Sequence, residues 1–422
     1  MNKHPFIATP CLTLWIKLVF ALGLRPRMCL CLGLGLGLAL STQITNAAPS
    51  VQRDVPVLFL EHVQERPPTL SNIRSAPESS GLDGANVAIA DNNTTGRFTG
   101  EHYQLTAKLF DDSDGAIAAA RVWIDSGNTF IVAKLPAATL LTLSRDEHIA
   151  KHAIIFNVSA KDDVLRNEQC QPRLLHTIPS RAMLTDGLAQ FLMSKRWKKW
   201  LLLRGQREED KLFSAALKRS AKRFGANIID EREWQFNSDL RRSAQNEIKL
   251  FSQSKDYDVT LIADEIGDIG EYIPYNTWLP RPAAGTQGLT PTGWHWSIEQ
   301  WGAAQLQNRF TDYAKRDMND VDYAAWLAVR AIGEAITRTK SNDDTTLYQY
   351  LLSDNFQLSA FKGRRLNFRK WNGQLRQPIP LVQPNALISQ SPQEGYLHPH
   401  SEMDTLGYDR PEVSCAFEAP TL

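Results

Sequence analysis

Acidic side chains follow several short apolar runs of the sequence, and together they could bind a cation. If these runs are strands of parallel sheets, their carboxyl ends meet at one edge, and residues that follow different strands can share a site. Carboxylate oxygens suit a cationic solute or a hard metal ion such as calcium. The alternative is that these acids cap the helices that follow and complement the helix dipoles. The acids at the predicted strand ends are Asp111, Asp112, Asp114, Asp162, Asp163, Asp264 and Glu265.

Aromatic and histidine residues offer a second set of candidates. Trp294 and Trp296, with Trp301 nearby, could form a wall for a ring-bearing ligand such as an aromatic alcohol or acid. The alternative is that these tryptophans pack in the protein interior between two parts of the chain. His398 and His400 are spaced like metal ligands, but no third ligand accompanies them, and we predict no metal site.

Local signatures of enzymes are missing from the sequence. It has no H-E-x-x-H, no G-x-S-x-G, no phosphate-binding G-x-x-x-x-G-K-[ST] and no C-x-x-C. We therefore predict that the protein is not an enzyme and needs no cofactor. A hydrolase with a dispersed triad, for example Ser159 with His176 or His295, is the alternative that sequence leaves open.

Composition excludes two further classes of protein. The 422 residues include 47 Lys and Arg against 46 Asp and Glu, a net charge of +1. A nucleic-acid binder normally carries a clear basic excess, so we predict no nucleic-acid partner. No run after the N-terminus approaches the roughly 18 apolar residues of a membrane span, so the processed chain is not expected to be an integral membrane protein.

The first residues are typical of an export signal. Lys3, Lys17 and two arginines precede an apolar run at 28–40, and small residues lead to Ala47. This pattern predicts a secretory signal peptide over 1–47, with a membrane anchor as the alternative. Removing it leaves Cys170 and Cys415, and two thiols in an oxidising compartment predict a disulfide.

Strand and helix patterns alternate along the remaining chain. Two successive runs of strand–helix units with continuous apolar strands predict an α/β protein with two parallel sheets, each covered by helices. A hairpin is expected from residues 365–368 and 377–382 around Asn372 and Gly373. The other predicted strands are 55–60, 103–110, 129–133, 153–158, 174–178, 200–204, 226–230 and 259–263. The predicted helices are 81–91, 115–124, 137–148, 180–193, 208–224, 239–252, 297–315, 321–338 and 347–352, and residues 280–292 are expected to form a linker.

Short motifs in this order of elements resemble the type I periplasmic solute-binding proteins of ABC transporters, the Leu/Ile/Val-binding kind. They are GANVAIADNN at 84–93, Asp111, IPS at 178–180, AAWLAVRAI at 324–332, and GRRLNF at 363–368 followed by Asn372-Gly373. Four segments are more similar to a subgroup associated with PQQ-dependent alcohol dehydrogenase systems. They are ADNNTTGRF at 90–98, GWHW at 293–296, WGAAQL at 301–306 and DTLGYDRP at 404–411.

The resemblance implies two Rossmann-like lobes joined by a three-segment hinge. Lobe 1 would comprise 48–172 and 290–342, lobe 2 would comprise 173–289 and 343–390, and 391–422 would form a C-terminal tail. The crossings are expected near 167–174, 280–292 and 340–345. In such proteins the ligand lies between the lobes, and closure of the lobes around it is read by the permease.

The resemblance also indicates the loops that would hold a ligand. Amino-acid-binding members use a Ser after the third strand and a Thr after the fourth to hold the ligand carboxylate. Here the first loop contains Ala137 and no hydroxyl, and the second offers Ser159 with Lys161 as a possible replacement, so an ordinary amino acid is in doubt. The complete set of cleft candidates is Asp111, Asp112, Ala137, Ser159, Lys161, Asp162, Gln206, Asp264, Glu265, Trp294 and Trp296.

The function that follows is that of a monomeric periplasmic protein. It would bind a small solute in the interlobe cleft and deliver it to an ABC transporter permease linked to PQQ-dependent alcohol catabolism. The alternatives are a periplasmic sensor or accessory protein of a quinoprotein dehydrogenase, and a secreted hydrolase.

Overall fold

A parallel sheet forms the centre of the first lobe. The computed structural model describes residues 53–63, 77–235, 240–267 and 269–415, so the predicted signal peptide lies outside the described residues. The strand order is β2-β1-β3-β4-β5, and every neighbouring pair is parallel. The strands are β1 (Arg53–His62), β2 (Glu101–Phe110), β3 (Phe130–Lys134), β4 (Ile154–Asn157) and β5 (Leu174–His176).

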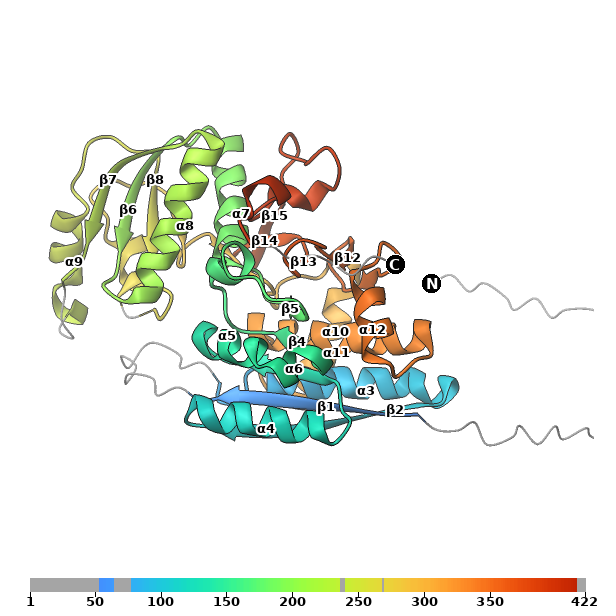
Figure 1. Cartoon of the computed structure of the whole chain (residues 1–422). Helices are drawn as coiled ribbons and strands as arrows, with labels where there is room; N and C mark the ends of the chain where they lie inside the picture. The colour runs from blue at the N-terminus through green and yellow to red at the C-terminus, as the bar shows by residue number, and fades with distance from the viewer. Residues whose placement is uncertain (1–52, 64–76, 236–239, 268, 416–422) are drawn as a thin grey trace, which may run out of the picture. The chain divides into compact units, whose positions relative to one another are not determined.

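Helices cover both faces of this sheet (Figure 1). Val57 and Phe59 of β1 pack with the core residues of α3, α10 and α11, whereas Leu58 and Leu60 pack with α4, α5 and α6. This alternation follows from the two-residue period of a strand, which sends successive side chains to opposite faces. The helices are α3 (Leu82–Thr99), α4 (Ser113–Asp125), α5 (Ala137–Arg145), α6 (Glu147–His152), α10 (Ala303–Ala314) and α11 (Asp320–Thr339).

The second lobe repeats this arrangement. Its sheet has the order β7-β6-β8-β9, again all parallel, with Trp200 and Leu202 facing α7 and α8, and Leu201 and Leu203 facing the other core cluster. Two parallel sheets, each covered by helices, confirm the α/β prediction. The elements are β6 (Lys199–Arg204), β7 (Asn227–Glu233), β8 (Val259–Ala263), β9 (Ala283–Gly285), α7 (Arg181–Ser194), α8 (Glu208–Phe224) and α9 (Leu240–Phe251).

Antiparallel strands near the C-terminus differ from the predicted hairpin. Strand β12 (Arg365–Phe368) pairs with β13 (Leu375–Arg376) and with β11 (Leu358–Ser359), and not with 377–382. Instead, β14 (Ile379–Gln383) pairs with β15 (Ala386–Ser391) and β10 (Thr290–Pro291). The predicted linker 280–292 thus contains β9 and β10, and the predicted helix 137–148 is interrupted at Asp146, which caps α6 by accepting the Ile149 N–H.

Packing of the late elements bears on the lobe boundaries. Leu347 and Leu351 of α12 (Asp344–Leu352) and Leu366 of β12 belong to the core cluster of the first lobe. Ile379 and Leu381 belong to that of the second. The boundaries remain a prediction, and this packing argues for a third crossing near 376–379 in place of 340–345.

The predicted disulfide is confirmed. Cys170 and Cys415 are bonded, with their Cα atoms 5.8 Å apart, although 245 residues separate them in sequence. Among the described residues, none of the helices combines the length and the hydrophobicity of a membrane span.

Candidate functional site

A cleft of about 1070 Å³ lies between the carboxyl ends of the two sheets. The first lobe contributes the end of β1, the loops after β3 and β4, and the beginning of α11. The second contributes the first turns of α7 and α8, the loop after β8 and the segment from β9 to β10. In a parallel sheet these loops emerge at one edge, which is where ligands of such folds bind.

Six of the predicted candidates line this cleft. They come from three loops, one after each of β3, β4 and β8, as expected for residues placed at strand ends. Their role as ligand contacts stays a prediction. The six are Ala137, Ser159, Lys161, Asp162, Asp264 and Glu265.

The other five candidates are not part of the lining. Asp112 caps α4 by accepting the Gly115 N–H at 2.6 Å, which is the helix-capping role given above as the alternative to cation binding. Asp111, the residue before it, is exposed. Trp294 is buried, stacks on Tyr323 with ring centroids 4.5 Å apart and donates from Nε1 to Gln307, so it packs in the first lobe. Trp296 and Gln206 are exposed outside the lining.

Every cationic Lys or Arg of the lining has an acidic partner. Lys134, at the end of β3, is paired with Glu61 at the end of β1, and both side chains are largely buried. Lys161 Nζ lies 3.7 Å from Asp320 Oδ2. The pair of Lys134 and Glu61 was not predicted from the sequence, although each residue stands at a strand end.

Arg181 joins the two walls of the cleft. It is the first residue of α7 and is 5% exposed. Its Nη2 donates to Glu265 Oε2 at 2.6 Å, and its Nη1 lies 3.4 Å from Asp162 Oδ1, which belongs to the first lobe. A cation at a helix N-terminus opposes the helix dipole, so Arg181 is placed here by these two carboxylates and not by local helix preference.

Asp320 holds the backbone where the chain crosses between the lobes. Its Oδ1 accepts the N–H groups of Gly293 at 2.8 Å and Trp294 at 2.9 Å, and the hydroxyl of Thr292. This carboxylate therefore connects the start of α11 to the backbone of residues 292–294.

The lining is strongly acidic overall. It contains eight carboxylates against three cationic side chains, with His62 as a further titratable group. Asp264 is almost fully buried and accepts the N–H groups of Ile269 and Gly270 at 2.9 and 2.6 Å. The eight carboxylates belong to Glu61, Glu78, Asp162, Glu208, Glu209, Asp264, Glu265 and Asp320.

This negative field acts on Asp210, just behind the lining. Burial, together with the charges of Asp264 and Glu265, raises the pKa of Asp210 to about 6, even though its carboxylate accepts the Glu265 N–H at 2.9 Å. Because the folded pKa lies above the ordinary value of 3.8, the folded state binds the proton more tightly, and its stability falls as the pH rises through 6.

An Asp210→Asn variant should lack this pH dependence. We expect its free energy of unfolding to improve relative to the wild type by about 1–2 kcal/mol between pH 4 and pH 7, a value discounted for solvent screening near the open cleft. Urea unfolding at several pH values measures it. A difference between Asp210→Asn and the wild type that stays constant with pH would refute the coupling.

No metal-binding group is evident in the parts of the chain that the structure describes. No cluster of three or more His, Cys, Asp or Glu side chains there could hold an ion. Ser159 Oγ donates to Leu135 O at 3.4 Å and has no hydrogen bond to a histidine among the described residues. His176 is fully buried beside Asn157, so these residues do not form a nucleophile–base pair.

One protein family matches part of the sequence. Residues 70–246, less than half of the chain, match a family described as periplasmic binding protein. No curated protein matches the chain by sequence.

Solved structures are similar over most of the chain. A branched-chain amino acid ABC transporter periplasmic ligand-binding protein from Burkholderia xenovorans LB400 has 16% identity and a TM-score of 0.67, over 87% of this chain and 100% of that one. A leucine-, isoleucine-, valine-, threonine- and alanine-binding protein from Brucella ovis, in a closed conformation, has 15% identity and a TM-score of 0.64, with 87% and 100% covered. A solute-binding protein from Rhodopseudomonas palustris BisB5 in complex with 3,4-dihydroxybenzoic acid has 10% identity and a TM-score of 0.60, with 80% and 97% covered. At these identities the likeness shows the fold.

Proposed function

We propose that this chain, whose fold is that of the type I periplasmic binding proteins, is an exported solute-binding protein that works with an ABC transporter. The observation that carries the proposal is the cleft of about 1070 Å³ between two parallel sheets, lined from both lobes. A cleft shared by two lobes can couple binding to closure, because a solute that contacts both walls favours the closed state. Such a protein binds and releases its solute without changing it, and its partner is the permease.

The charges of the lining support a cationic solute, such as a small amine. Lys134, Lys161 and Arg181 are each occupied by a carboxylate of the protein itself, so an anionic ligand would have to displace one of these pairs. An ammonium group, in contrast, would reduce the repulsion among the acidic groups of the lining. The protein of similar fold from Brucella ovis is named for amino acids, and that from Rhodopseudomonas palustris is in complex with 3,4-dihydroxybenzoic acid, so the fold alone does not fix the solute class.

Thermal unfolding with matched probes tests this proposal. Each pair has a similar skeleton and differs in charge: putrescine and succinate, phenethylamine and phenylacetate, leucinamide and leucine. A ligand at 100 times its Kd stabilises the folded state by about 2.7 kcal/mol, which is a clear shift in Tm. We expect the cationic member of at least one pair to raise the Tm and its partner not to.

A matched pair of variants locates the binding. Glu265→Gln removes a cleft carboxylate and should abolish the shift, whereas Asp354→Asn, which is exposed and outside the lining, should leave it unchanged. A shift with succinate or phenylacetate alone would contradict the cationic solute, and no shift with any probe at millimolar concentration would count against this solute class.

The link to PQQ-dependent alcohol catabolism is a finer part of the proposal. It rests on the resemblance of residues 90–98, 293–296, 301–306 and 404–411 to one subgroup. Affinity purification from the periplasm and membrane would test it. Recovery of a permease supports the transport role, whereas recovery of a quinoprotein dehydrogenase without a permease favours a sensor or accessory protein.

A further inference from the structure

The C-terminal segment 403–415, here called the tail strap, contacts both lobes. None of its residues lines the cleft. Contacts with the first lobe begin at Arg369, which follows β12 and is 1% exposed. Its guanidinium donates to Asp404 Oδ1 at 2.8 Å, to Met403 O at 3.0 Å and to Leu406 O at 2.7 Å.

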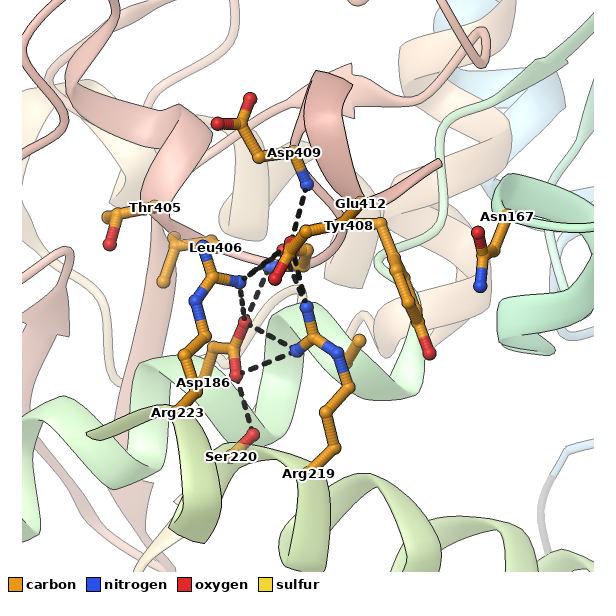
Figure 2. Close-up of polar contacts among 12 residues, drawn as sticks. Asn167, Asp186, Arg219, Ser220, Arg223, Thr405, Leu406, Tyr408, Asp409 and Glu412 are labelled. Carbon is orange, nitrogen blue, oxygen red and sulfur yellow. Dashed lines mark hydrogen bonds and ion pairs between the residues drawn. The ribbon is translucent and has the colours of Figure 1, made fainter. Parts of the chain in front are cut away.

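The contacts with the second lobe centre on Asp186 of α7, which is fully buried. Asp186 Oδ2 accepts the Gly407 N–H at 2.9 Å and pairs with Arg219 and Arg223 of α8, both at 3.0 Å. The two arginines also donate to Gly407 O. Figure 2 shows both guanidinium groups converging on Asp186, with Glu412 on their other side.

The charges of Asp186, Arg219 and Arg223 favour the state in which the strap is bound to the second lobe. Burial raises the pKa of Asp186, and the two arginines oppose this effect. Arg219 also lies over the ring of Tyr408, 4.2 Å from its centroid. Without the strap, both arginines would lose the carbonyl of Gly407 and the carboxylate of Glu412.

The end of the strap returns to the first lobe. Cys415 is bonded to Cys170, which belongs to the core cluster of that lobe, and its N–H donates to Asn167 O at 2.8 Å. The first lobe therefore holds the carbonyl of Leu406 and Cys415, while the second lobe holds Gly407 and packs the Leu406 side chain in its core. Because Leu406 and Gly407 are adjacent in the chain, the lobes cannot separate here unless one set of contacts breaks.

We propose that the tail strap is a fourth connection between the lobes, which fixes their pivot and restricts opening of the ligand-free cleft. The proposal goes beyond the function proposed above, because it concerns the hinge and holds for any solute. Movement of the lobes in the intact protein is then rotation about residues 403–415. Loss of the disulfide frees the end of the strap, and the three crossings near 176–180, 290–294 and 376–379 then carry more of the hinge.

Hydrogen exchange of the ligand-free protein tests this proposal. The wild type is compared with a Cys170→Ser/Cys415→Ser variant, and with wild-type protein reduced by dithiothreitol after folding, which removes any dependence on refolding of the variant. We expect amides of the crossings, including Thr177 and Gly293, to exchange at least about tenfold faster without the disulfide. Small-angle scattering should show a larger radius of gyration.

The exchange rates of control peptides distinguish a role of the disulfide in the hinge from a general stabilisation of the whole fold. Amides of α4 and β3, inside the first lobe, should keep their exchange rates, and Asp354→Asn, an exposed change outside the strap, should behave as the wild type. Faster exchange confined to the strap, or equally faster exchange in α4 and β3, would overturn the proposal. No solute is used, so a failure here is distinct from a failure of the proposed transport role.

Discussion

Replacement of Arg369 by methionine is expected to lower the free energy of unfolding by about 3–5 kcal/mol, the range for removal of one partner of a buried ion pair. The guanidinium is 1% exposed and donates to Asp404 and to the carbonyls of Met403 and Leu406. Methionine fills much of the space and donates nothing, so these buried carbonyls lose their donor. Burial alone would raise the pKa of Asp404, but hydrogen bonds from Arg376 and the charge of Arg369 hold it below its ordinary value.

The neighbouring Lys370 supplies a matched control for this prediction. Its ammonium pairs with Asp354 at 2.9 Å, but both side chains are well exposed. Lys370→Met should therefore cost at most about 1 kcal/mol. Denaturant unfolding measures both variants under the same conditions. Equal losses for the two would show that the buried network of Arg369 does not stabilise the tail.

The second large effect is a change in how stability depends on pH. Lys362 is fully buried, and its ammonium donates to Gln377 Oε1 at 2.7 Å and Pro378 O at 3.2 Å, beside the third crossing. Burial lowers the pKa of Lys362 to about 7 from 10.5, with the charge of Asp320 acting in the opposite direction. Between these values the unfolded state binds more protons, so the free energy of unfolding rises with pH.

A Lys362→Met variant should lose this dependence. At pH 6 the wild type carries the full cost of a buried ammonium, so the stability of the variant relative to the wild type is greatest there and falls by several kcal/mol up to pH 10. Each pKa unit corresponds to about 1.4 kcal/mol. Urea unfolding across this range measures the difference, with Lys370→Met as the exposed control. A difference that stays constant, or rises with pH, would contradict the low pKa.

Regular elements of the fold could be predicted because their signals are local. The apolar runs at 200–204 and 259–263 became β6 and β8, and Ser180 caps α7 by accepting the Met183 N–H. The pairing of β13 with β12 and of β14 with β15 could not be predicted in this way. The Asn372-Gly373 turn marks a hairpin, but the short strand at 375–376 leaves no clear alternation to set the register.

Part of the candidate site could be predicted because the ends of strands can also be recognised from the local sequence. Asp264 and Glu265 follow an apolar strand, and strand ends converge in any parallel sheet, so their place in the lining followed from the pattern. The sequence shows that Trp294 is large and aromatic, but not that Tyr323 lies against it. Arg181 was missed because its two carboxylates come from distant segments, although an arginine at the first position of a helix is itself a signal of such partners.

The clearest test of the central claim is small-angle scattering of the mature protein, titrated with the probe that gives the largest thermal shift. If the cleft traps a solute between closing lobes, the radius of gyration falls to a plateau at one equivalent of probe. If binding saturates while the radius of gyration stays unchanged, the two lobes do not close on the solute, and the proposed transport role is wrong.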